Sequence, residues 1–141
     1  MKKFLSIILI SLFTAMFIAA CGGGAADSGD TIDVSAIGDA ANGEVLFAEL
    51  AIGDNNAPGC ITCHSLESNV TLVGPSQSDI GLRAETRVDG LSAEEYIRQS
   101  IVDPEAYLVE GFASGLMYAD YASDLTEDQI NDIVAYMLTL R

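Results

Sequence analysis

The five residues Cys60-Ile61-Thr62-Cys63-His64 bring two thiols and an imidazole together in one short stretch of chain. Thiols three positions apart on a turn can each add to one vinyl group of a haem, and the next residue can then present its imidazole to the iron. The motif therefore predicts one covalently attached haem c, bonded to Cys60 and Cys63, with His64 as an axial ligand.

Three other interpretations of the cysteine pair have less support. A zinc site normally takes four ligands, but His64 is the only histidine and no second cysteine pair follows. A thioredoxin-like redox pair lies beside a βαβ unit, and no segment here alternates as a strand does. A disulfide between Cys60 and Cys63 would leave the adjoining histidine unexplained.

A single histidine leaves the sixth position of the iron to a methionine or to an exchangeable small ligand. Met137 falls on the apolar stripe of a predicted helix, which favours a role in the core. Met117 lies instead in an irregular stretch from about residue 110 to 123, flanked by Gly111 and Gly115, and such a loop can bend over a haem. We therefore predict Met117 as the second axial ligand.

Two helices that position these groups are indicated by capping boxes, Ser92 with Glu95 and Thr126 with Gln129. Pro104 is expected to end the first of them. The second must bury one face, because its apolar residues fall at helical spacing. These residues are Ile130, Ile133, Val134, Met137 and Leu138. With no alternating strand in the sequence, an all-α fold is expected.

The first twenty residues are typical of an export signal, with an apolar run too short for a confident membrane span. Ile18-Ala19-Ala20-Cys21 resembles a bacterial lipobox, which implies that Cys21 becomes the acylated first residue of a membrane-anchored lipoprotein. An ordinary cleaved signal is the alternative. Residues 21–38 are rich in Gly, Ala, Ser and Asp and are expected to form a flexible tether. The folded domain is then expected over residues 39–141.

The chain is strongly acidic, with a net charge of −15. Removal of the signal would leave four arginines against 21 acidic residues, a net charge of −17. Such a domain is not expected to bind nucleic acid or an anionic membrane surface through its own charges. A docking partner is expected to present a basic patch, although solubility alone explains the acidity equally well.

From about residue 42 to residue 140 the chain resembles the small class I c-type cytochromes. The resemblance implies a cytochrome c fold, in which the N-terminal and C-terminal helices cross around a covalently bound haem. Here the first helix is expected over residues 40–50. Gly43 and Phe47 match the glycine and the aromatic residue of the crossing and are expected to meet Tyr136.

Further site residues follow from the same resemblance. Val73-Gly74-Pro75 is similar to the family's Gly-Pro segment, which implies that the carbonyl of Pro75 accepts a hydrogen bond from His64 and raises its basicity. Arg83 and Arg87 are candidates to pair with the haem propionates, because the arginine fork suits carboxylates. Solvent-exposed charge is the alternative for both arginines.

Residues 96–104 resemble a branch found as partner domains of respiratory oxidases, in which proline usually follows the ligand methionine. Here Tyr118 follows Met117. The chain also resembles the single-haem lipoprotein subunit of alternative complex III, a menaquinol-oxidising assembly. These resemblances imply a non-enzymatic electron carrier on the periplasmic face of the membrane, either a free shuttle or a subunit. Its expected donor is a quinol-oxidising complex, and its acceptor a terminal oxidase or photosynthetic reaction centre.

An open-site haem peroxidase or gas sensor is the main alternative. It requires that Met117 does not bind the iron, because a vacant position is what admits peroxide or nitric oxide. A haem that only stabilises the fold is the third hypothesis.

Overall fold

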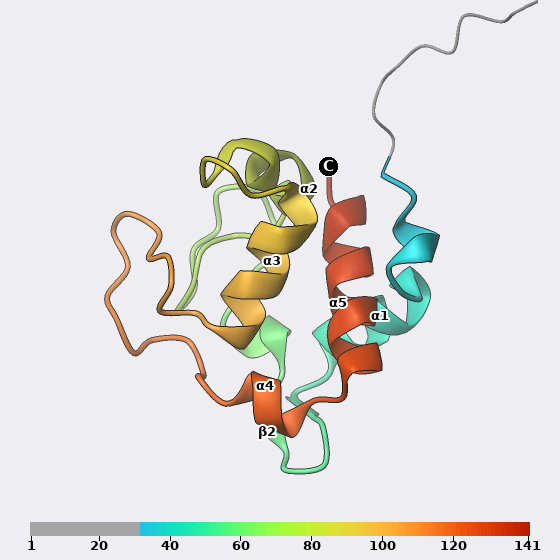
Figure 1. The fold of residues 1–141 in the computed structure, drawn as a ribbon. Coiled ribbons are helices and arrows are strands. Elements are labelled where there is room, and N and C mark those ends of the chain that lie inside the picture. Colours follow the sequence, from blue (N-terminus) through green and yellow to red (C-terminus); the bar gives the residue numbers. More distant parts are fainter. Residues whose placement is uncertain (1–31) are drawn as a thin grey trace, which may run out of the picture. The chain divides into compact units, whose positions relative to one another are not determined.

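The computed structural model describes residues 32–141, and these are mainly helical (Figure 1). The α-helices are α1 (Ala40–Ala48), α2 (Ile80–Arg83), α3 (Ala93–Val102), α4 (Tyr121–Asp124) and α5 (Glu127–Thr139). Three short 3₁₀ turns are η1 (Val34–Ala36), η2 (Cys60–Thr62) and η3 (Ala84–Thr86). Strands β1 (Ala51–Ile52) and β2 (Ala57–Pro58) pair antiparallel, with Ala51 opposite Pro58. None of the helices within residues 32–141 has both the length and the apolar character needed to span a membrane.

Helices α1 and α5 cross at a glycine, as the family resemblance implies (Figure 1). A Cβ atom built on Gly43 would lie 1.9 Å from the carbonyl oxygen of Asp132 and 2.8 Å from Cβ of Tyr136. Only glycine therefore allows the two backbones to come this close. One turn later the rings of Phe47 and Tyr136 meet with their centroids 5.7 Å apart, a distance typical of a favourable aromatic pair. The crossing expected of a cytochrome c fold is present.

Both predicted capping boxes are present. Ser92 begins α3 by accepting a hydrogen bond from the backbone of Glu95, whose side chain accepts in return from the backbone of Ser92. Thr126 and Gln129 do the same for α5. Helices α3 and α5 lie side by side (Figure 1) and bury apolar faces against each other, and α5 also packs against α1. The buried side chains of the three helices include Leu46, Phe47, Tyr96, Ile97, Ile101, Ile130, Ile133, Val134, Tyr136 and Leu138.

Besides the short elements α2, β1 and β2, which were not expected, the structure differs from the sequence-based expectations in the tether and in the stretch that holds Met117. Residues 32–38, assigned from the sequence to a flexible tether, include the turn η1, and Ile32, Val34 and Ile37 pack against the core. The folded domain therefore begins before residue 39, because these apolar side chains are partly buried against the hydrophobic core. Within the stretch from 110 to 123, the last residues form α4, which was not expected. The rest of the proposed tether and Cys21 lie outside the described residues.

Candidate functional site

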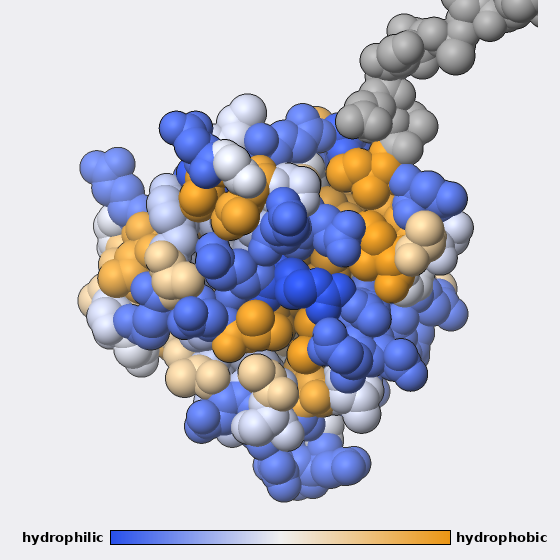
Figure 2. Space-filling model, viewed as in Figure 1, coloured by the Kyte–Doolittle hydropathy of each residue, from blue (hydrophilic) through white to orange (hydrophobic). Residues whose placement is uncertain are grey.

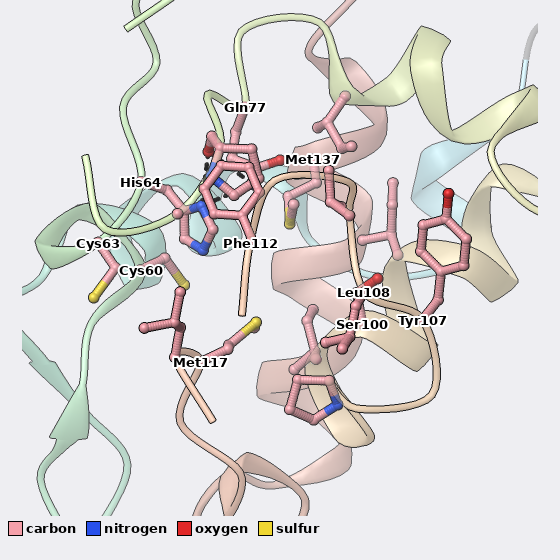
Figure 3. A pocket seen from close by; sticks show the side chains of 18 of the residues that line it. Cys60, Cys63, His64, Gln77, Ser100, Tyr107, Leu108, Phe112, Met117 and Met137 are labelled. Atoms are coloured by element: carbon pink, nitrogen blue, oxygen red, sulfur yellow. Dashed lines mark hydrogen bonds between the residues drawn. The ribbon is translucent and has the colours of Figure 1, made fainter. Parts of the chain in front are cut away.

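The cysteine motif forms one tight turn at the end of the hairpin. The backbone N–H of Cys63 donates to the carbonyl of Cys60 at 3.1 Å, and that of His64 donates to the same oxygen at 2.9 Å. The backbone N–H of Gly59 donates to the carbonyl of Leu50 at 3.0 Å, which holds the turn against the segment that follows α1. Cys60, Cys63 and His64 are thereby placed along one wall of a crevice (Figure 3).

The crevice is open to solvent, and the empty space in it, its open mouth included, is about 1160 Å³. Segments far apart in sequence line it, from the cysteine motif, the Val73–Pro75 stretch, α3 and the Met117 loop. Several large apolar residues at the crevice are unusually exposed: Val73 by 48 %, Leu108 by 44 % and Leu116 by 48 %. An apolar, plate-shaped group such as a porphyrin would cover such side chains and gain from their burial.

The imidazole of His64 is held in one orientation. Its Nδ1 lies 2.8 Å from the carbonyl oxygen of Pro75, the contact that the resemblance implies. A ring that donates from Nδ1 keeps a lone pair on Nε2, the form that a metal requires. Burial lowers the pKa of His64 below its usual value, which also favours the neutral ring. A Cβ atom at Gly74 would lie 2.4 Å from Cε1 of His64, so glycine is needed to seat the ring.

The structure places Met117 at the same crevice. Figure 3 shows Met117 and His64 reaching the crevice from different segments of the chain. Met137 also lines the crevice while packing against the core from α5. Two methionine sulfurs are therefore available there, and only Met117 comes from a loop.

Hydrogen bonds anchor that loop on both sides of Met117. Before it, the carboxylate of Glu105 accepts from the hydroxyl of Ser114 and, at 2.8 Å, from the backbone N–H of Gly115. After it, the hydroxyl of Tyr118 donates to Asp124 at 2.5 Å. Asp124 also accepts from the side chain of Asn55 at 2.7 Å, which links the loop to the β1–β2 turn. Tyr118 thus holds the chain where proline stands in the resembling branch.

The two arginines have different surroundings. Nε of Arg83 donates to Asp79 at 2.6 Å and its Nη2 donates to the carbonyl of Ser76 at 2.5 Å, so much of its fork is already engaged. Arg87 also lines the crevice, and its Nε is buried without a hydrogen-bond partner among the described residues. A buried guanidinium nitrogen normally has an acceptor, and a propionate would supply one. Arg87 therefore fits the propionate role better than Arg83.

The thiols of Cys60 and Cys63 are not joined in a disulfide. Burial raises the pKa of the Cys60 thiol to about 11, so this sulfur is uncharged at neutral pH. Within residues 32–141, no group of three or more histidine, cysteine, aspartate or glutamate side chains is placed to hold a metal ion. The zinc interpretation thus has no support from the described part of the chain.

Three residues of the site were not predicted from the sequence. Gln77 contacts the ring of His64, and Glu105 and Asp124 anchor the Met117 loop. The position of Gln77, two residues after the Gly-Pro segment, could have suggested its proximity to the histidine. No pattern in the sequence pairs Glu105 with Ser114, or Tyr118 with Asp124, because both pairs depend on the path of an irregular loop.

Comparison with known proteins agrees with the geometry. Residues 40–141 match the family model described as Cytochrome c. No curated protein matches the chain. The family match covers the crossing helices, the cysteine motif and the Met117 loop, and its members carry covalently attached haem c in an electron-transfer role. With Cys60, Cys63 and His64 forming the haem-attachment motif inside an all-α domain of this kind, the chain belongs to the cytochrome c family.

Proposed function

We propose that this protein is a lipid-anchored electron carrier in which His64 and Met117 both bind the haem iron. The observation that carries the proposal is the Met117 loop, which is anchored on both sides while its methionine lies at the same crevice as His64. A carrier needs both axial positions filled by the protein, so that the iron changes charge without exchanging ligands. An anchored methionine meets that need, whereas a catalytic haem requires an open position.

Bound haem supplies a one-electron couple, and the residues of this chain hold and tune it. Cys60 and Cys63 would fix the macrocycle by thioether bonds, and Arg87 would pair with a propionate. Pro75 holds the ring of His64 through Nδ1, which leaves Nε2 directed away from Pro75 and toward the crevice. Methionine ligation and an apolar enclosure both raise the reduction potential, as expected of a carrier that delivers electrons to an oxidase.

The location and partners form the second part of the proposal. Acylation at Cys21 would tether the domain to the periplasmic face of the membrane. Without the signal the chain has a net charge of −17 and no lysine. Such an acidic protein favours redox partners with a basic patch. Figure 2 shows one face on which hydrophilic residues predominate, interrupted by separate hydrophobic patches. The donor would be a quinol-oxidising complex, with this chain as shuttle or subunit, and the acceptor a terminal oxidase or photosynthetic reaction centre.

Spectroscopy of the haem-loaded protein tests the axial ligands. The oxidised protein should be low-spin and show the weak long-wavelength band of sulfur-to-iron charge transfer, and Met117→Leu should abolish this band. Met137→Leu is the matched control, because Met137 lines the same crevice, and it should keep the band. A high-spin native protein that binds carbon monoxide rapidly would contradict the carrier and favour the peroxidase or gas sensor.

Two measurements on the native membrane test the anchor and the partners. Mass spectrometry of the N-terminal peptide should find an acylated Cys21, and an unmodified cysteine would refute the anchor. Purification in mild detergent should show whether subunits of a quinol-oxidising complex remain bound. Their stable retention would identify a subunit, and their absence, with electron exchange in solution, would identify a shuttle.

A further inference from the structure

The side chain of Gln77 lies against the imidazole that the proposed function assigns to the iron. Gln77 is only 6 % exposed, and its backbone N–H donates to the carbonyl of Ser65 at 2.8 Å. Its amide nitrogen lies 2.9 Å from Nδ1 of His64 and 3.4 Å from the carbonyl oxygen of Pro75. Its amide oxygen is buried and has no hydrogen-bond partner among residues 32–141. Two partners thus approach one ring nitrogen.

The protonation that iron binding requires decides which end of the amide faces the ring. A histidine that binds iron through Nε2 carries its only ring proton on Nδ1, so Nδ1 can donate but cannot accept. An amide nitrogen is also only a donor, and two donors facing each other at 2.9 Å repel. The two ends of a glutamine amide have nearly the same shape. Turning the amide over would therefore replace the repulsion with a hydrogen bond, without moving Gln77.

We propose that Gln77 is a positioning residue and that its amide oxygen, together with the carbonyl of Pro75, accepts a hydrogen bond from Nδ1–H of His64. This proposal rests on the proposed function, in which His64 binds the iron. With its oxygen turned toward the ring, Gln77 shares the proton with Pro75, and the oxygen gains the partner that it lacks. The amide nitrogen then takes the buried position that the oxygen held and gives up its longer contact of 3.4 Å with the carbonyl oxygen of Pro75. Two acceptors on one N–H increase the electron donation of the imidazole to the iron. This stabilises the ferric form, so Gln77 lowers the reduction potential of this protein below the value that Pro75 alone would set.

The direction in which Gln77 shifts the reduction potential distinguishes an acceptor for His64 from a donor to Pro75. If the amide nitrogen instead donates to Pro75, it competes with His64 for that carbonyl oxygen. Gln77 would then weaken the bond between Pro75 and His64 and raise the potential. A residue that only fills space would leave the potential unchanged.

Equilibrium potentiometry of Gln77→Met, a change to an apolar side chain of similar length, tests the proposal. The potential should rise, so that the ratio of reduced to oxidised haem at a fixed applied potential increases severalfold, a tenfold increase being about 59 mV for one electron. Gln99→Met, in α3 and away from the crevice, is the matched control and should leave the ratio unchanged. A fall in potential, or no change, would overturn the role.

A second measurement needs no variant and holds if Gln77→Met does not fold. Neutron diffraction of the native haem protein distinguishes an amide oxygen from a deuterated nitrogen. Oxygen facing Nδ1 of His64 would support the proposal, and nitrogen facing it would refute it. The native oxidised spectrum separates the two failures, because a low-spin methionine-ligated spectrum keeps the proposed function even where the role of Gln77 is refuted.

Discussion

Replacing Gly74 with alanine should displace the axial histidine. The new Cβ atom would lie 2.4 Å from Cε1, 2.8 Å from Nδ1 and 3.1 Å from Nε2 of His64. Ordinary contacts of a Cβ atom begin near 3.4 Å, so the ring must retreat by about 1 Å. A retreat of that size lengthens the 2.8 Å hydrogen bond to Pro75 by up to about 1 Å, and at about 3.8 Å it is beyond the limit of a hydrogen bond.

The expected losses follow from that displacement. Overpacking and the loss of one buried hydrogen bond together destabilise the fold by about 2 kcal/mol, which lowers the Tm of a domain this size by about 10 °C. Without the acceptor at Pro75, His64 donates less to ferric iron, and a differential effect of about 1 kcal/mol raises the potential by about 40 mV. Thermal melting followed by the haem absorbance and equilibrium potentiometry measure the two effects.

Gly90→Ala provides the control for the backbone effect of the substitution. Gly90 has a φ of +87°, and nothing lies within 4 Å of the position of its Cβ. This variant should lose about 1 kcal/mol through backbone strain and keep the native potential. If Gly74→Ala melts no lower than Gly90→Ala and has the native potential, the contact between Gly74 and His64 does not constrain the ring.

Three further predictions concern the crossing and the loop. Phe47→Ala removes a ring that is 1 % exposed and should cost about 3–5 kcal/mol by denaturant unfolding while the folded fraction keeps its haem spectrum; a loss under 1 kcal/mol would contradict the crossing. Tyr118→Phe removes the hydrogen bond to Asp124 and should weaken the methionine charge-transfer band and speed carbon monoxide binding, and unchanged values would show that the bond does not anchor the loop. The hydroxyl of Ser114 and the backbone N–H of Gly115 lower the pKa of Glu105, so this stabilisation is present above the ordinary pKa of about 4 and is lost as the pH falls through the lowered value. Acid titration should therefore diminish the band, Glu105→Gln should weaken it already at neutral pH, and a variant that titrates as the native protein does would refute the link.

Much of the fold follows from short-range rules in the sequence. The capping boxes begin α3 and α5 at the predicted residues, because each is a local exchange of hydrogen bonds three residues apart. The meeting of Phe47 with Tyr136 follows from the family resemblance and is confirmed by the ring contact. The short helix α4 was missed, since four residues carry too little periodicity to indicate a helix.

The parts of the site that lie within one short sequence motif could be predicted. The cysteine motif and the Gly-Pro segment indicate His64 and its partner Pro75 from spacing and resemblance alone. The long-range contacts were not predictable. Asp124 reaches Asn55, 69 positions away, only through the tertiary fold, and the different surroundings of Arg83 and Arg87 depend on neighbours such as Asp79 that happen to be in reach.

A crystal structure of the native, haem-loaded protein would show both the covalent attachment of the haem and the two ligands of its iron. We expect thioether bonds from Cys60 and Cys63, with the iron bound by Nε2 of His64 and the sulfur of Met117. Free or mutually bonded cysteine sulfurs would contradict covalent attachment, and a water or another side chain in place of Met117 would contradict the electron carrier.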